Sequence, residues 1–435
     1  MEDEFARLVA AGRRLARTEL VRSSASLLAS DVAAAALTLV FLLLVARQGG
    51  PTARGVLAFV STLPVLLSHA GTLGLNSASL YFARREPEQR DVLVTSGLVV
   101  GLSVGAIASV AAFALFSVRP GWVPNPVTPG LLAAGLASTG FLCAQVILES
   151  SLIGGGRVGP VNLVRVAMPA SSIAGILVLP LIGEPVGGSA AVWAWIGGRL
   201  LGFLITVFFS VTYLGLAGVG RTRIHIHTLL RFGLPAHGSL LLDLPVRRLD
   251  TLVLGAVRGA GPVGVYTAAV NIAELLLYFP RSVSSMLLTA GAARSDEEAK
   301  ALIRRAMWYV VLGSTVAAVV GAIFAPEICI LLFGAEFESA AGPLRILLIG
   351  MVGFSVRWVY ASGLSARGRP GLASVAALPP FLAIVGLNLF LIPRFGVMGA
   401  AWSSLLSYWL GGAVMFFVNR RADRKESLLG SGTAA

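Results

Sequence analysis

The chain has 435 residues, of which 56% are hydrophobic and only 13% are charged, and its mean hydropathy is +0.84. This composition leaves too little polar material to cover a water-soluble surface of that size. The charged residues gather in short stretches between apolar runs of about 20 residues, the length that crosses roughly 30 Å of hydrocarbon. A soluble globular domain is therefore excluded, and an all-α polytopic membrane protein is expected.

The formal net charge of +13 does not indicate a nucleic-acid partner. Most of the 34 cations are arginines in loops beside apolar runs, where the positive-inside rule and anionic lipid headgroups favour them. The four histidines show no HExxH or Cys/His ligand spacing, and Cys143 and Cys329 lie far apart inside expected spans. Neither a metal nor another cofactor is expected.

Residues 1–25 form a charged helix with apolar side chains along one side, ahead of the first apolar run. We interpret this segment as a cytoplasmic interfacial helix rather than a cleavable signal peptide. Twelve spans are expected after it, at 26–46, 55–81, 91–118, 128–153, 158–180, 188–215, 228–255, 262–290, 302–333, 342–366, 371–393 and 397–419. A basic tail, 420–435, ends the chain.

Lys and Arg are distributed very unequally between alternate loops. The side that carries both termini has 22, whereas the other side has 5, namely Arg47, Arg54, Arg119, Arg258 and Arg394. Basic loops stay in the cytoplasm, so both termini are expected there.

The chain also has the pattern of a duplication. Three pairs of short matches recur at near-constant offsets of 209, 212 and 210 residues: Gly55-Val56 with Gly264-Val265, Gly156-Arg157 with Gly368-Arg369, and Ala190-Ala191 with Ala400-Ala401. These matches predict two six-helix halves, 26–218 and 219–419. Because each half has an even number of spans, the halves are expected to be related by an axis along the membrane normal.

No catalytic pattern is present in the sequence: it has no GxSxG, no GxxxxGK[ST], and no paired carboxylates with a histidine in reach. A literal GxGxxG at residues 154–159 lies between two apolar spans without a preceding strand, so it is not interpreted as a nucleotide site. An enzyme is therefore not expected. Transport would depend on an ion gradient, a substrate gradient or a partner.

Charged residues inside spans carry the functional information, because an arginine near the bilayer centre costs about 2.5–3.5 kcal/mol even on a lenient scale. In the seventh span Arg247 can pair with Asp243 and Asp250 on one helix face, whereas Arg248 is rotated about 100° away without a local carboxylate. The cluster either steadies a proline-bent helix or binds an anionic headgroup, since guanidinium groups bind phosphate in bidentate fashion. Seven arginines lie within spans: Arg165, Arg199, Arg247, Arg248, Arg281, Arg345 and Arg357.

Acidic residues inside spans are either counter-ions to these arginines or coupling sites for a proton or another cation. Asp31 and Glu274 have no basic residue three or four positions away, which makes them the candidates for the coupling ion. A cation from another helix could still neutralise either of them.

Four stretches resemble the polysaccharide-transporter branch of the multidrug/oligosaccharidyl-lipid/polysaccharide exporter superfamily, which includes oligosaccharide flippases. They are Asn388 to Ala401, Asp250 to Gly255 with Gly264 to Tyr266, Leu332 to Gly334 with Phe337 and Ala340, and Ser365 to Arg369. The resemblance runs over nearly the whole chain, and each stretch alone is a weak signal. It implies two six-helix bundles around a central, often cationic cavity that is lined by spans 1, 2, 7 and 8.

The resemblance implies a flippase or exporter that moves a lipid-linked, pyrophosphate-bearing oligosaccharide across a bacterial cytoplasmic membrane by alternating access. Arg247, Arg248 and Arg281 lie on the cavity helices and are the candidates for headgroup binding. The expected partners are this substrate, membrane lipids and a glycan polymerase or export machinery. The alternatives are a multidrug or organic-ion antiporter of the same superfamily, a membrane-embedded glycan polymerase or ligase, and a non-transporting scaffold.

Overall fold

The computed structural model describes residues 2–181, 183, 185–291, 296–367 and 370–432, and all of the regular secondary structure in these ranges is helical. The helices are α1 (Glu2–Gly71), α2 (Leu75–Arg85), η1 (Pro87–Gln89), α3 (Arg90–Val118), η2 (Pro120–Trp122), α4 (Pro129–Gly154), α5 (Val158–Leu181), α6 (Gly188–Leu214), α7 (Val219–Arg258), α8 (Ala260–Leu275), α9 (Tyr278–Gly291), α10 (Asp296–Ile323), α11 (Ala325–Phe333), η3 (Ala335–Ala340), α12 (Ala341–Ala366), α13 (Pro370–Ala376) and α14 (Leu378–Gly432). The side chains of residues 2–24 are not described, so the expected interfacial face of 1–25 lies outside the described residues.

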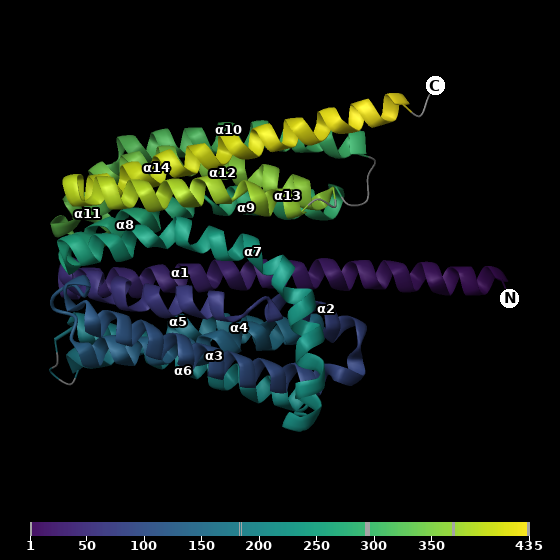
Figure 1. Cartoon of the computed structure of the whole chain (residues 1–435), viewed down its shortest axis with the longest axis horizontal. Coiled ribbons are helices and arrows are strands. Elements are labelled where there is room, and N and C mark those ends of the chain that lie inside the picture. Colours follow the sequence, from purple (N-terminus) through teal and green to yellow (C-terminus); the bar gives the residue numbers. More distant parts are fainter. Residues whose placement is uncertain (1, 182, 184, 292–295, 368–369, 433–435) are drawn as a thin grey trace.

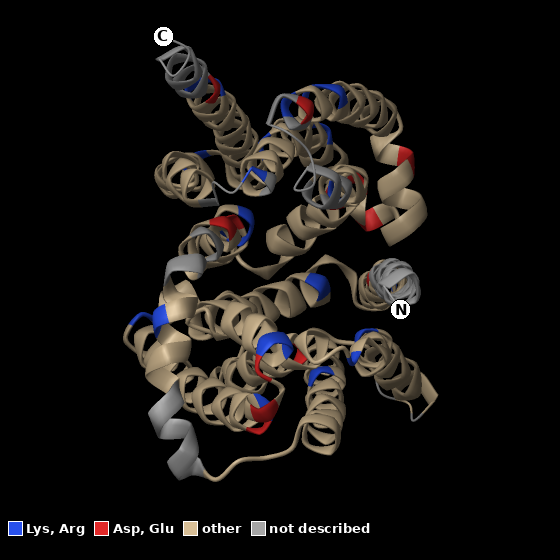
Figure 2. Ribbon diagram, turned by 90° about the vertical axis from the view of Figure 1, so that its right-hand side faces the viewer, with Lys and Arg blue, Asp and Glu red and all other residues tan. Residues whose placement is uncertain are grey.

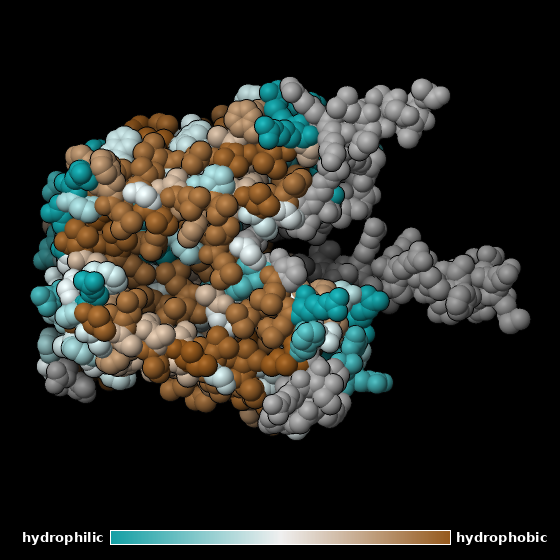
Figure 3. Space-filling model, in the orientation of Figure 1, coloured by the Kyte–Doolittle hydropathy of each residue, from teal (hydrophilic) through white to brown (hydrophobic). Residues whose placement is uncertain are grey.

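The chain is a multi-pass membrane protein. Within the described residues, nine helical stretches are long and apolar enough to cross a bilayer. Apolar side chains cover the middle of the face shown in Figure 3, and hydrophilic residues gather towards its two ends. Large apolar side chains such as those of Trp308, Leu331 and Val375 are more than two thirds exposed, which is the arrangement that a hydrocarbon environment favours.

Two of these stretches fold back on themselves at a glycine. Gly50 in α1 and Gly396 in α14 have positive φ angles of 67° and 56° with non-helical ψ, conformations that glycine adopts without steric cost. Residues 34–42 and 54–65 of α1 line the same cavity, and the Ser407 hydroxyl of α14 donates to the Pro380 carbonyl at 2.7 Å. Each of the two long helices is therefore an antiparallel pair.

Five expected spans agree with helices to within one residue at each end, namely those at 91–118, 128–153, 158–180, 188–215 and 342–366. Four others are interrupted, so the prediction of continuous helices was wrong there. The span at 371–393 breaks at Ala377, between α13 and α14. The span at 55–81 breaks between Gly71 and Leu75, where Leu73 and Gly74 take positive φ; the span at 262–290 breaks after Leu275; and the span at 302–333 breaks at Phe324, ahead of a helix that has a proline in its first turn.

The helices form two groups that meet along α1, α7 and α8 (Figure 1). Helices α2 to α6 pack with α1 on one side, and α9 to α14 pack with α8 on the other, while α7 contacts both groups. Seen end-on, the two groups are separate lobes (Figure 2). The two ends of the described chain lie at the same end of the molecule (Figure 1).

Helices α1 and α8 approach one another closely at residues that belong to the matching sequence pairs. A Cβ atom placed on Gly55 would lie 1.7 Å from the Ala260 carbonyl oxygen, and one placed on Gly264 would lie 1.9 Å from the Pro51 carbonyl oxygen. Gly55 and Gly264 differ by the offset of 209, and so do Pro51 and Ala260. The contact is thus reciprocal, with a glycine of each helix packed against a backbone carbonyl of the other.

Candidate functional site

Two adjoining cavities of about 410 Å³ and 230 Å³ lie between the two groups of helices. They are lined by segments of α1, α5, α6, α7, α8 and α9, and Thr38, Arg248 and Asn271 line both. Among the described lining residues the charged side chains are six arginines and one carboxylate: Arg54, Arg165, Arg199, Arg247, Arg248, Arg281 and Glu274. We call this arginine-lined space the central cavity.

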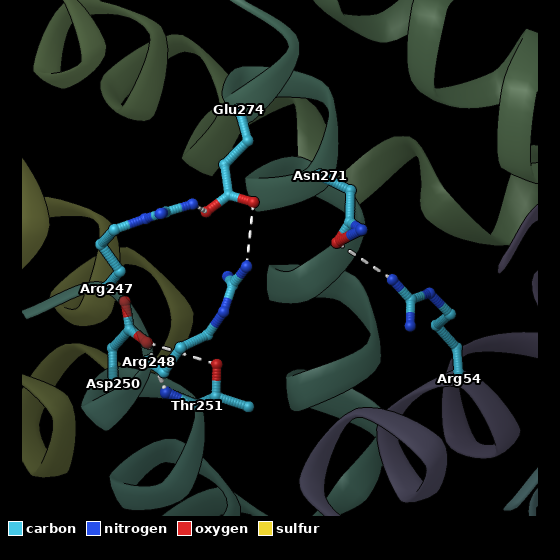
Figure 4. Close-up of polar contacts among 7 residues, drawn as sticks. All are labelled: Arg54, Arg247, Arg248, Asp250, Thr251, Asn271 and Glu274. Atoms are coloured by element: carbon cyan, nitrogen blue, oxygen red, sulfur yellow. Dashed lines mark hydrogen bonds and ion pairs between the residues drawn. The ribbon is translucent and has the colours of Figure 1, made fainter. Parts of the chain in front are cut away.

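Glu274 of α8 bridges two arginines of α7 (Figure 4). Its Oε1 accepts from Arg247 Nη2 at 2.7 Å, and its Oε2 accepts from Arg248 Nη2 at 2.9 Å. Consecutive residues of a helix point about 100° apart, so a single carboxylate reaches both guanidinium groups only because it approaches from the neighbouring helix. The three side chains together keep one net positive charge facing the cavity.

Arg281 of α9 completes the smaller cavity. Its guanidinium group lies 4.9 Å from the centre of the Trp358 ring and 5.8 Å from that of Tyr278, both within cation–π range. The structure therefore brings Arg247, Arg248 and Arg281 to one cavity.

Arg54 is a cavity residue that the sequence analysis placed in an external loop. Its side chain is only 2% exposed, and Nη2 donates to the Asn271 amide oxygen at 3.1 Å (Figure 4). Its Nε is buried without a protein acceptor. The signal that could have placed it is Pro51, because proline favours the first turn of a helix and would start the second span three residues before Arg54.

The acidic residues of α7 pair across helices rather than along α7. Asp243 accepts a short hydrogen bond from Arg357 of α12. Asp250 is buried and accepts from the Tyr266 hydroxyl, from the Ser404 hydroxyl at 3.1 Å and from the Thr251 amide at 2.6 Å. The expected pairing of Arg247 with these two aspartates was therefore wrong, because spacing along one helix carries no information about partners on α8, α12 and α14.

The two coupling candidates both have partners on neighbouring helices. Glu274 holds the two arginines of α7, and Asp31 of α1 accepts from Arg165 Nη1 of α5 at 2.7 Å. The Asp31 side chain is 55% exposed, whereas that of Glu274 is 18% exposed. The structure thus places Glu274 in the central cavity and Asp31 next to one of the cavity's arginines.

The arrangement is suited to an anion with more than one charge. Guanidinium groups stay protonated and present planar pairs of N–H donors to phosphate oxygens. Six of them around one space, with a single carboxylate among the described lining residues, make the cavity a poor host for an organic cation. They make it a good host for a phosphate or pyrophosphate.

Comparison with known sequences gives partial matches to glycan transporters. Residues 163–342, less than half of the chain, match the family model described as polysaccharide biosynthesis protein. The chain is 26% identical over 164 residues to the probable low-salt glycan biosynthesis flippase Agl15 of Haloferax volcanii, covering 37% of this chain and 35% of that protein. It is 23% identical over 272 residues to a putative O-antigen transporter of Shigella flexneri, covering 60% and 64%.

Comparison with solved structures covers nearly the whole chain. The lipid II flippase MurJ in an inward closed conformation superposes with a TM-score of 0.77 at 14% identity, over 92% of this chain and 87% of MurJ. A multidrug resistance MATE transporter in an inward-facing conformation superposes with a TM-score of 0.72 at 17% identity, over 90% and 96%. The resemblance to the polysaccharide-transporter branch is confirmed: the chain has the fold of this transporter superfamily and, over residues 163–342, the sequence pattern of polysaccharide biosynthesis proteins.

Proposed function

We propose that the protein is a flippase or exporter that moves a lipid-linked oligosaccharide with a pyrophosphate group across the cytoplasmic membrane of a bacterium for polysaccharide biosynthesis. The observation that carries the proposal is the central cavity, in which six arginines face one carboxylate among the described lining residues. The pyrophosphate binds Arg247, Arg248 and Arg281, while the sugar extends into the larger cavity and the lipid chain stays in the bilayer. The names of the sequence relatives support this substrate class.

The architecture that fits this activity has twelve spans in two six-helix halves. Two of the nine long apolar stretches, Ala25–Gly71 and Gly371–Asp423, are divided by Gly50 and Gly396, and α7 provides one more crossing. The reciprocal contact of Gly55 with Gly264 supports a symmetry axis along the membrane normal between the halves. Alternating access then consists of one half rocking against the other around the cavity.

Glu274 is the residue through which transport is coupled to an ion in this proposal. While it is ionised, it occupies donors of Arg247 and Arg248 that a pyrophosphate would use. Protonation of Glu274, or its displacement by substrate, releases these donors, so proton binding and headgroup binding favour one another. Asp31 acts in the same way on Arg165, at the rim of the larger cavity.

The direct test is flipping of a pyrophosphate-linked oligosaccharide lipid in proteoliposomes, measured by the accessibility of its sugar to an added glycan-binding protein. Arg248→Gln should reduce the flipping rate at least tenfold, because it removes a headgroup donor and leaves Glu274 to neutralise Arg247. Arg345→Gln is the matched control, because Arg345 is exposed, donates to the Ala322 carbonyl and lies outside the cavity. Equal activity of both variants and the wild type would refute the headgroup assignment.

The coupling proposal has a separate test in the same proteoliposomes. Glu274→Gln should bind the headgroup at least as tightly as wild type, yet its flipping should no longer respond to an imposed pH gradient. Asp31→Asn tests the second candidate in the same assay. Wild-type flipping that ignores both pH and sodium gradients would leave passive exchange as the mechanism.

The same preparation distinguishes the antiporter alternative. Uptake of organic cations in exchange for protons, without flipping of the lipid-linked sugar, would indicate a multidrug transporter. The arginine lining argues against that outcome, because a cationic drug would be repelled from the cavity.

A further inference from the structure

A second basic site lies on the outside of the C-terminal group of helices, away from the central cavity. It is a groove of about 690 Å³ between α10, α12 and α14, helices that contribute nothing to the lining of the central cavity. We call it the outer groove. Its described charged lining residues are four cations and one carboxylate: Lys300, Arg304, Arg367, Arg420 and Asp423.

The outer groove changes from charged to apolar along each of its helices in the same direction. On α10, Lys300 and Arg304 are followed one and two turns later by Trp308 and Val311. On α14 the order along the chain is reversed, so that Phe416 lies one turn before Arg420. The groove thus has a basic end, formed by the first turns of α10 and the C-terminal part of α14. Its other end is apolar.

The basic end is built into the packing of the helices rather than being only surface charge. Arg367 follows the last turn of α12, its side chain is 4% exposed, and its Nη1 donates to Asp423 at 2.8 Å. The guanidinium group of Arg420 lies over the Phe416 ring, 5.1 Å from the ring centre. Arg304 and Arg420 are both exposed at the mouth of the groove, where a ligand can reach them.

We propose that the outer groove binds the phosphate headgroup of an anionic membrane phospholipid, with the acyl chains along Trp308 and Phe416. Basic pockets between membrane helices on the cytoplasmic side bind such headgroups, and the order of the groove lining, from charged to apolar, fits a molecule with a phosphate at one end and hydrocarbon at the other. The lipid is a resident one rather than the transported one, because the groove shares no helix with the central cavity. This inference does not depend on what the central cavity carries.

The test compares two pairs of adjacent arginines. Arg304→Gln with Arg420→Gln removes two cations from the groove, whereas Arg305→Gln with Arg421→Gln removes their exposed sequence neighbours, which do not line it. Each protein in detergent is mixed with equal amounts of phosphatidylglycerol and phosphatidylcholine that have the same acyl chains, and bound lipid is counted by native mass spectrometry. All four replaced side chains are exposed, so both double variants should fold, and their unfolding temperatures check this.

We expect wild type and the neighbour variant to retain phosphatidylglycerol in preference to phosphatidylcholine. The groove variant should bind phosphatidylglycerol roughly fivefold more weakly for each cation removed. Two outcomes would overturn the proposal. If the wild type does not prefer phosphatidylglycerol, there is no site for it. If the neighbour variant loses as much phosphatidylglycerol binding as the groove variant, the binding depends on diffuse surface charge.

Two competitors separate the possible sources of phosphate. Inorganic phosphate should not displace the bound phosphatidylglycerol, because it has no chains to contact Trp308 and Phe416. A pyrophosphate-linked oligosaccharide lipid should displace it no better than phosphatidylglycerol itself. Displacement by inorganic phosphate at matched concentration would show a general anion-binding site. Stronger displacement by the sugar lipid than by phosphatidylglycerol would show a substrate-binding site. Either result overturns the assignment to a resident phospholipid.

Discussion

Asp250 shows how a buried charge in α7 is stabilised by neutral hydroxyl groups. It accepts hydrogen bonds from Tyr266 of α8 and Ser404 of α14, and thereby joins three helices of the C-terminal group. Asp250 and Tyr266 both belong to one of the stretches that resemble polysaccharide transporters. Their contact gives that stretch a structural role: it fixes the positions of α7 and α8, from which Arg248 and Glu274 reach the cavity.

We therefore predict that Tyr266→Phe destabilises the protein without removing any charge. The phenylalanine keeps the shape of the side chain but leaves Asp250 with one donor fewer, and a hydrogen bond to a charged group contributes about 1.5–3 kcal/mol. The midpoint of unfolding in detergent should fall for Tyr266→Phe and stay unchanged for Tyr309→Phe, whose ring is 68% exposed on α10. An equal midpoint for both variants would show that the hydroxyl contributes nothing.

A second prediction at this scale concerns Asp250 itself. Asp250→Ala leaves the Tyr266 and Ser404 hydroxyl groups and the Thr251 amide buried without their acceptor, so the yield of folded protein should fall further than for Tyr266→Phe. Fluorescence-detected size-exclusion chromatography measures this yield. A yield for Asp250→Ala equal to that for Tyr266→Phe would mean that the other hydrogen bonds to Asp250 have little effect.

The sequence alone locates charged side chains within the apolar runs, but it does not identify their partners. The arginines of α7 and α9 were recognised because a charge inside an apolar run is costly, and that cost can be read from the sequence. Their partners were missed: Glu274 is 26 residues from Arg248, and Asp243 is 114 residues from Arg357. Such pairs depend on how helices pack, and a single sequence does not contain that packing in any periodic pattern.

At the scale of helices, the contact between α1 and α8 depends on two glycines. Gly55 and Gly264 leave no room for a Cβ atom, since backbone atoms of the opposite helix would lie within 2 Å of it. Small residues at such crossings allow membrane helices to approach closely. The backbone cannot move aside as the end of a flexible side chain can, so even one methyl group must push the helices apart.

We predict that Gly264→Ala destabilises the protein by about 1–3 kcal/mol, the usual range for inserting a methyl group into a packed core. Gly261→Ala, one turn earlier on α8, is the control, because its Cβ atom would meet only the Thr52 hydroxyl at 3.8 Å. Unfolding in detergent should distinguish the two variants. If both are equally stable, α1 and α8 do not meet at Gly264 in the membrane.

Helix positions were predictable from apolar runs, whereas their interruptions were not. The expected spans at 128–153 and 342–366 agree with α4 and α12 because each lies between polar loops. The break after Gly71 was missed because neither Leu73, which is hydrophobic, nor Gly74, which is uncharged, differs in hydropathy from the residues of the flanking helices. The turn there is set by backbone angles, and hydropathy does not report those.

For the whole molecule, the distribution of Lys and Arg predicts the orientation. Since Arg54 lies in the cavity and not in a loop, the external side has one cation fewer than the sequence analysis assigned, which strengthens the asymmetry. Reporter fusions after residues 50, 123 and 338 should behave as external, and fusions after 87, 225 and 425 as cytoplasmic. Reversed or mixed behaviour would contradict both the orientation and the number of crossings.

In the proposed flippase, the excess of arginines in the central cavity also makes transport sensitive to voltage. A charge that crosses the full membrane potential changes its energy by about 2.3 kcal/mol for each 100 mV. When the cavity closes to one face of the membrane and opens to the other, its charges pass through part of that potential, even if they barely move in space. A negative interior therefore draws the empty, positively charged carrier towards the cytoplasm-facing form, where substrate is loaded. A bound pyrophosphate cancels part of this charge and weakens the pull, so we expect an inside-negative potential to speed the return of the empty carrier more than the loaded step.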